Sequence, residues 1–185
     1  MGETRSSLIR FRNRAGIVAV LVLLAACGSA ENARSLPADA ELQRQFTGHE
    51  AQFRELQRMS DEDSWVWRIA PGFLSVQQGG GPPRSGDEKD LPRWDRYREL
   101  FRQCGLKDGL LRDRTMGREA IFFPVAARTV GTVDSIEKGI AWVEGEVSPI
   151  VPSLDEGITW GGTRRAAPVF HRLKDNWYLY LRYNE

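Results

Sequence analysis

The side chains that most often bind metals or act as nucleophiles are scarce in this chain of 185 residues. Two histidines, His49 and His171, and two cysteines, Cys27 and Cys104, are present. A zinc site needs three or four convergent ligands, and neither histidine has a partner at ligand spacing. No serine lies in a G-x-S-x-G motif, and the glycines of residues 79–81 lack the lysine of a phosphate-binding loop. The sequence therefore indicates no metal, no cofactor and no catalytic residue.

Cys27 stands at the end of a segment that has three parts. Residues 1–14 carry four arginines and one acid, residues 15–26 are uncharged and apolar, and small residues surround the cysteine. A basic start, an apolar core of roughly 7–15 residues and small residues at the cleavage point make up a secretory signal. A membrane-spanning helix needs roughly 18 or more apolar residues. We therefore expect residues 1–26 to be a signal peptide rather than a transmembrane helix.

The four residues Leu24-Ala25-Ala26-Cys27 resemble the lipobox of bacterial lipoproteins, which is a leucine, two small residues and a cysteine. In that family the cysteine thiol is joined to a diacylglyceryl group, a dedicated peptidase cuts before the cysteine, and the new amino group is acylated. The resemblance implies that Cys27 is lipidated and that the membrane is a partner of the chain through this lipid. Several acyl chains anchor a protein stably, whereas one chain binds reversibly. The alternative is an ordinary cleaved signal in which Cys27 has no role.

The residue after Cys27 bears on the destination of the chain. It is Gly28, whereas enterobacterial members of the family that stay at the inner membrane carry Asp at that position. The resemblance therefore implies the outer membrane of a Gram-negative bacterium, on the periplasmic side. Residues 27–36 are interpreted as the lipidated cysteine and a short tether. Residues 37–185 have the size of a single domain that can bury a sizeable core.

The charge balance of the chain excludes one class of partner. Four of the 26 basic residues and one of the 25 acids lie in residues 1–27, which leaves a formal charge of about −2 on the remainder. Such a balance does not provide the basic surface that nucleic acids require, so we expect no nucleic-acid partner. If Cys27 is lipidated, Cys104 is the only cysteine left in the sequence and no internal disulfide forms.

Apolar residues at helical spacing predict a long helix near the start of the domain. Pro37 and Asp39 suit its first turn, and we place it at residues 38–59. Gly48 weakens its middle by about 1 kcal/mol relative to alanine. The acids of residues 61–63 lack the spacing of a calcium loop and are interpreted as a solvated turn after the helix. The stripe that carries the prediction consists of Leu42, Phe46, His49, Phe53 and Leu56.

A second, shorter helix is predicted for residues 91–105. Pro92 lies near its start, and Gly105 lies where glycine is favoured just after a helix. Cys104 falls on the apolar stripe of this helix, so we interpret it as a small buried side chain, with a reactive thiol as the alternative. The other members of the stripe are Trp94, Tyr97 and Phe101.

The second half of the chain has the pattern of strands without intervening helices. Because no helix separates the last four predicted strands, we expect a mostly antiparallel sheet. The fold prediction is a single α+β domain in which the two helices cover one face of a sheet of four to six strands. Residues 79–90 are predicted to form a mobile surface loop, and residues 148–166 a long loop. Strands are predicted at residues 64–70, 73–76, 120–127, 129–136, 140–147, 167–173 and 177–183.

Aromatic residues on the last predicted strand suggest a surface for a partner or ligand. Tyr178, Tyr180 and Arg182 share one face of this strand because side chains alternate along it. If the face is exposed, its rings can stack on a sugar or dock a partner protein. The alternative is that the tyrosines complete the core or a second packing layer, since aromatic residues usually lie inside.

The preferred hypothesis is a lipid-anchored envelope protein that binds another envelope protein or a cell-wall glycan and is not an enzyme. Residues 138–156 and 170–183 also resemble small uncharacterised lipoproteins of Gram-negative bacteria, which implies no particular activity. One alternative is an envelope hydrolase acting on lipid, peptide or glycan with His171 as a base. The members of a Ser-His-Asp triad are close together in the folded protein but distant in sequence, so the sequence alone leaves this alternative open. Another is a secreted enzyme inhibitor that presents residues 148–166 as a rigid loop.

Overall fold

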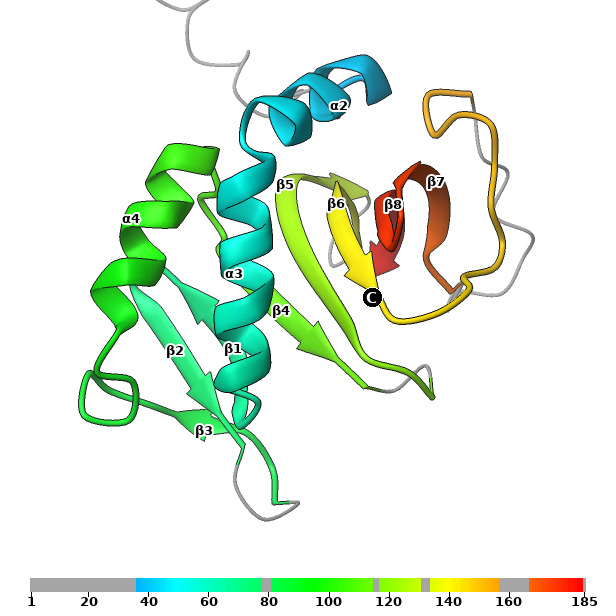
Figure 1. Cartoon of the computed structure of the whole chain (residues 1–185). Helices are drawn as coiled ribbons and strands as arrows, with labels where there is room; N and C mark the ends of the chain where they lie inside the picture. The colour runs from blue at the N-terminus through cyan, green and yellow to red at the C-terminus, as the bar shows by residue number, and fades with distance from the viewer. Residues whose placement is uncertain (1–35, 78–80, 115–116, 131–133, 157–166, 185) are drawn as a thin grey trace, which may run out of the picture. The chain divides into compact units, whose positions relative to one another are not determined.

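The computed structural model describes residues 36–77, 81–114, 117–130, 134–156 and 167–184. The predicted signal peptide, the lipobox and most of the predicted tether lie outside these residues. The described part contains three helices and one sheet of eight strands (Figure 1). The α+β class is therefore confirmed.

The sheet is larger than the four to six strands predicted from the sequence. Its strands are β1 (Val66–Ala70), β2 (Phe73–Val76), β3 (Arg84–Ser85), β4 (Leu110–Asp113), β5 (Ala120–Val130), β6 (Asp134–Val143), β7 (Val169–Lys174) and β8 (Trp177–Asn184). They lie in the order β3-β2-β1-β4-β5-β6-β8-β7, and every neighbouring pair is antiparallel, as predicted. The two strands that the sequence did not reveal are β3, inside the predicted loop of residues 79–90, and β4. β3 has two residues and β4 has four.

β5 and β6 form a long hairpin that sequence analysis divides at the wrong places. Residues 129–136, predicted as one strand, span the end of β5 and the start of β6. Residues 137–139, which separate the predicted strands 129–136 and 140–147, lie inside β6 and form no turn. A β-carbon at Gly139 would lie 2.3 Å from the carbonyl oxygen of Phe123 on β5. Gly139 therefore permits the close approach of a neighbouring strand and does not mark a turn.

The second predicted helix is confirmed as α4 (Trp94–Cys104). The residue after it, Gly105, has a left-handed φ of 70° and donates its N–H to the carbonyl groups of Arg102 and Phe101. The N–H of Leu106 donates to Phe101 at 2.8 Å. These contacts satisfy the free carbonyl groups at the end of the helix, which is the role expected of a glycine at this position.

Two helices, α2 (Asp39–Gly48) and α3 (Glu50–Glu62), replace the single helix predicted over residues 38–59. His49 lies between them with φ −132° and ψ 25°, and its N–H donates to the carbonyl three residues before it. The prediction is wrong because the apolar stripe continues across the break. The break allows α3 to pack beside α4 while α2 turns to contact β6 and β8 (Figure 1).

Buried side chains form two clusters, one on each face of the sheet. The larger cluster, which we call the main core, includes the apolar sides of the three helices. β8 contributes to both clusters because its side chains alternate, with Trp177 and Leu179 in the main core. The smaller cluster, which we call the second core, consists of Ala120, Phe122, Ala141, Val143, Val147, Phe170, Tyr178 and Tyr180.

Both edges of the sheet carry features that limit pairing with other strands. β3 has two residues and follows residues 82–83, which are both proline and cannot donate a hydrogen bond. At the opposite edge, Phe170 of β7 forms a parallel bridge with Ile150, which follows Pro149. Short edge strands and prolines reduce edge-to-edge association.

Alanine substitutions at two glycines, Gly48 and Gly109, are expected to change the stability of the fold in opposite directions. A β-carbon at Gly48, the last residue of α2, would have no neighbouring atom within 4 Å. Gly48→Ala is therefore expected to raise the free energy of unfolding by about 1 kcal/mol. Gly109→Ala is expected to lower it, because Gly109 has φ 70° and a β-carbon there would lie 1.9 Å from the Ile69 carbonyl oxygen. Urea unfolding measures both changes, and a Gly48→Ala chain less stable than wild type would contradict the first.

Candidate functional site

The tyrosines of the predicted partner surface are buried. Tyr178 is 1% exposed and Tyr180 is 0% exposed, and both lie in the second core. Tyr178 packs against Phe170 with ring centroids 5.7 Å apart, and Tyr180 packs against Phe122 at 4.8 Å. The two tyrosines therefore do not form an open surface. The alternative, a second packing layer, agrees with the structure.

Arg182, the third residue of that predicted surface, lies at the rim of the second core. Its side chain is 15% exposed, and its Nη2 donates to Glu137 Oε1 at 2.8 Å. The hydroxyl of Tyr180 donates to the same oxygen at 2.6 Å. Burial, together with the charge of Glu137, raises the pKa of Tyr180 well above its usual value, so the hydroxyl remains a donor. These contacts join β8 to β6, and the rings of Tyr178 and Tyr180 are not open to a ligand.

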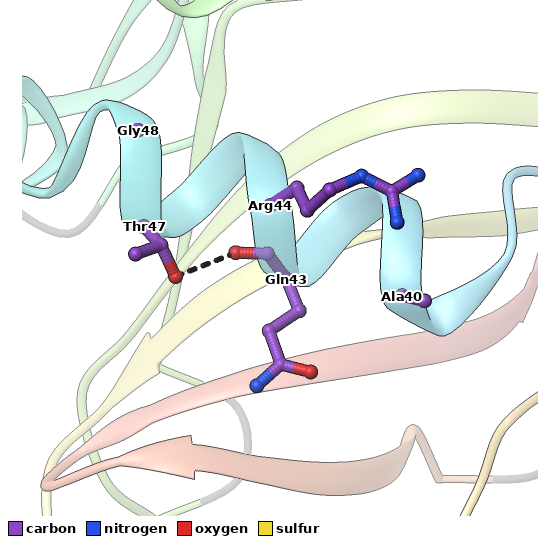
Figure 2. Close-up of a pocket in the computed structure, with 5 residues that line it drawn as sticks. All are labelled: Ala40, Gln43, Arg44, Thr47 and Gly48. Carbon is purple, nitrogen blue, oxygen red and sulfur yellow. Dashed lines mark hydrogen bonds between the residues drawn. The ribbon is translucent and has the colours of Figure 1, made fainter.

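A hollow of about 460 Å³ lies along the exposed side of α2 (Figure 2). Thr47 Oγ1 donates to the backbone carbonyl of Gln43 at 2.8 Å, so its hydrogen bond is made within the helix. Arg44 supplies the charge of the described lining, which suits contact with a polar or anionic group. The sequence contains no signal for this hollow, because its residues are simply those that lie off the apolar stripe. The described lining consists of Ala40, Gln43, Arg44, Thr47 and Gly48.

A buried lysine joins three segments that are distant in the sequence. Lys138 of β6 is 2% exposed, and its Nζ lies 2.8 Å from Asp39 Oδ1 and 2.6 Å from Asp155 Oδ1. We call these residues the Lys138 triad. The backbone N–H of Asp39 also donates to both carboxylate oxygens of Asp155, at 3.1 and 2.9 Å. Asp155 thereby caps the start of α2, where Ala38 provides no side-chain cap.

The groups around Asp39 keep its carboxylate ionised. Burial by itself raises the pKa of Asp39, but hydrogen bonds from Lys138, the Leu154 N–H and the Ser153 hydroxyl together lower it below its usual value. Leu154 N and Ser153 Oγ lie 2.7 and 2.9 Å from Asp39 Oδ2. A carboxylate with a lowered pKa is poorly matched to proton transfer at neutral pH. The triad therefore suits a structural joint better than a catalytic site.

The acidic residues at the end of α3 pair with arginines, and one of these acids is buried. Asp63 is buried and accepts hydrogen bonds from Arg93 Nε at 2.7 Å and from the Tyr97 hydroxyl at 2.8 Å. Asp61 pairs with the buried Arg112, whose Nη2 lies 3.2 Å away. Acids at a helix C-terminus are unfavourable beside its dipole, and the two arginines compensate for them. The prediction of a solvated turn is wrong for Asp63, which fastens α3 to α4.

The described histidines and cysteine occupy separate places in the fold. His49 lies at the break between α2 and α3, and Nδ1 of His171 on β7 lies 3.3 Å from the Val151 carbonyl oxygen. This contact differs from the serine and carboxylate partners that the hydrolase hypothesis requires. Cys104 is buried under α4 as predicted, and burial raises its pKa to about 12. Its thiol is therefore protonated and unreactive at neutral pH.

Comparisons with known proteins return no relative: the chain matches no family model, no curated protein and no solved structure. Among the described residues, His, Cys, Asp and Glu side chains form no group of three or more placed to hold a metal ion. None of the described helices combines the length and apolar character needed to cross a membrane.

The Lys138 triad predicts a pH-dependent contribution to stability. Lys138→Met is expected to lower the free energy of unfolding at neutral pH by about 2 kcal/mol, because it leaves the half-buried Asp39 carboxylate without its cation. The pKa of Asp39 is lowered in the folded state, so the triad stabilises above the unfolded-state pKa and loses its effect as pH falls through the folded-state pKa. Urea unfolding at a series of pH values measures the difference between the two chains.

The matched control for this experiment is Lys107→Met, since Lys107 is an exposed lysine on another part of the described surface. This change is expected to leave stability within about 0.5 kcal/mol of wild type. A Lys138→Met effect that stays constant from neutral to strongly acid pH would show that the triad does not act through ionised Asp39.

Burial of Cys104 predicts slow thiol chemistry. In a Cys27→Ala chain, Cys104 is the one remaining thiol. Its reaction with a chromogenic disulfide reagent in mildly alkaline buffer is expected to be limited by opening of the fold, because the raised pKa and the burial both suppress the thiolate. The absorbance change should become fast in denaturant. Equally fast reaction of the folded chain would contradict the buried position.

Proposed function

We propose that the chain is a lipoprotein of the bacterial cell envelope, anchored by a lipid on Cys27 and facing the periplasm from the outer membrane. The observation that carries the proposal is the agreement in position of the basic start, the apolar core and the lipobox ending at Cys27. Gly28, rather than Asp, supports the outer membrane as the destination.

In this proposal a short segment of sequence joins the lipidated cysteine to the folded part. Leu36, the first described residue, packs against the main core, and it follows Cys27 by nine residues. A fully extended chain of that length spans about 30 Å.

We propose further that the folded part acts by binding another envelope protein or a cell-wall glycan. Support comes from the state of three ionisable groups that are buried or half-buried. Asp39 is held ionised by Lys138, Asp63 is held by Arg93, and the Cys104 thiol is held protonated. Groups fixed in this way position segments of the chain and are poorly matched to proton transfer or nucleophilic attack.

The intact mass of the chain from membranes of its native host tests the anchor. The expected mass is that of residues 27–185 with a diacylglyceryl group on the thiol and an acyl group on the new amino terminus. Cys27→Ala is the matched variant and is expected to lose both groups, because no thiol remains at that position. A wild-type mass that corresponds to plain cleavage, or to the uncleaved chain, would refute the lipoprotein proposal.

Cross-linking in intact envelopes tests the binding role. A protein or cell-wall adduct is expected for the wild-type chain, and less of it is expected for Cys27→Ala, because the unanchored chain is not concentrated at the membrane. A lipidated chain that forms no adduct would refute the binding role while leaving the anchor in place.

A further inference from the structure

Among the described residues, the backbone groups along the outer edge of β7 are only partly hydrogen-bonded. Phe170 donates its N–H to the Pro149 carbonyl at 3.0 Å and accepts from the Val151 N–H at 2.8 Å. Strand residues two apart face the same way, so the N–H and C=O of Arg172 also point away from β8. Arg172 therefore offers a further donor and acceptor at this edge.

The segment that covers Phe170 is held to the fold at separate points. We call residues 147–156 the strap. Val147 packs in the second core, Leu154 packs in the main core, and Asp155 belongs to the Lys138 triad. Between these points Ile150 forms the bridge to Phe170, and its side chain is 47% exposed. The strap therefore pairs with the edge of β7 as an added strand would, but only at the single bridge between Ile150 and Phe170.

We propose that the edge of β7 from Phe170 to Arg172 is a strand-addition site for an extended acidic segment of a partner protein, and that the strap occupies part of this site when no partner is bound. The inference deepens the binding role proposed above and rests on it. In strand addition, main-chain hydrogen bonds give affinity and alternate side chains give specificity. A strand paired with both residues forms twice as many backbone hydrogen bonds as the strap does at Phe170.

The charge of the edge favours an acidic partner. Lys174 Nζ pairs with Glu50 at 3.0 Å. Arg172 is exposed, and its guanidinium donates to the backbone carbonyl of Asp175 at 3.3 Å and lies 5.3 Å from the ring centroid of Tyr178. These contacts leave Arg172 without a carboxylate partner among the described residues. A carboxylate from an added strand can therefore form a charge-assisted hydrogen bond with it.

The strap itself supplies a probe of the site. Its sequence, VSPIVPSLDE, ends in two acids. If the register of the bridge continues, the Val151 carbonyl and the Ser153 N–H face the N–H and C=O of Arg172. Asp155→Asn weakens the hold on the strap by removing one carboxylate charge from the Lys138 triad, and it leaves the apolar contacts of the strap unchanged.

The test is a titration of the full chain, purified in detergent, with a fluorescein-labelled peptide of residues 147–156. Anisotropy is expected to show saturable binding to the Asp155→Asn chain and about tenfold weaker binding to wild type, in which the strap competes. A peptide with Val151→Pro lacks the N–H that bonds Phe170. It is expected to bind about tenfold more weakly, which corresponds to the loss of one hydrogen bond.

Two protein variants locate the binding. Arg172→Glu, added to Asp155→Asn, is expected to weaken the peptide by about tenfold, because it places a like charge opposite the acids of the peptide. Arg118→Glu, at an exposed arginine outside the strap and β7, is the matched control and is expected to leave binding unchanged. Equal effects of the two changes would overturn the assignment to the β7 edge.

Three further results of these experiments would overturn the proposed site at the β7 edge. A folded Asp155→Asn chain with no saturable binding, or with equal affinity for the two peptides, overturns the proposal. If Asp155→Asn fails to fold, hydrogen exchange at the Arg172 amide of wild type in excess peptide replaces the titration. Slower exchange supports the site, and unchanged exchange overturns it. Neither negative result alters the mass on Cys27 or an envelope adduct, so failure of the edge is distinct from failure of the anchor or of the binding role.

Discussion

The packing of Trp177 against three phenylalanines is the contact on which the relative positions of the helices and the sheet depend. Its ring centroid lies 5.1 Å from that of Phe46 on α2, 6.0 Å from Phe53 on α3 and 5.8 Å from Phe123 on β5. Residues seven apart in a straight helix are separated by about 10.5 Å along its axis, yet the rings of Phe46 and Phe53 are 5.7 Å apart. The break at His49 brings both onto one tryptophan. Each buried ring contributes on the order of 2–3 kcal/mol, which exceeds the cost of interrupting the helix.

The tilt of α2 in turn determines where the charged groups meet. It carries Asp39 over β6, where Lys138 is buried and requires counter-charges because an unpaired buried ammonium group is costly. Asp155 supplies the second carboxylate, and this requirement fixes the end of the strap. The strap begins with Val147 in the second core and reaches the main core at Leu154, so it passes round the β7 edge from one face of the sheet to the other. A single ion cluster thereby ties the first helix to the segment that covers the sheet edge.

Sequence analysis succeeded where local chemistry decides the structure and failed where distant segments decide it. The end of α4 followed from Gly105, and the alternation of β8 placed Tyr178 and Tyr180 on one face. Whether that face is exposed depends on segments such as the one carrying Val147, which periodicity does not reveal. The helix break was missed because Trp177, more than a hundred residues later in the sequence, is what favours it. The Lys138 triad is likewise invisible in the sequence, since two of its members lie 116 residues apart.

The Lys138 triad also bears on which partners the β7 edge can accept. Two additional backbone hydrogen bonds contribute about 1 kcal/mol each. Drawing the half-exposed Asp155 away from Lys138 removes a charge-assisted hydrogen bond, which costs about 1.5 kcal/mol, and loss of the cap at the start of α2 costs about 1 kcal/mol more. Backbone pairing alone is therefore too weak to displace the whole strap. A partner must either pair a carboxylate with Arg172 or lift only the residues around Ile150 and leave Asp155 in place. Because specificity is a difference of affinities, the triad favours acidic peptides over uncharged ones wherever the whole strap must be displaced.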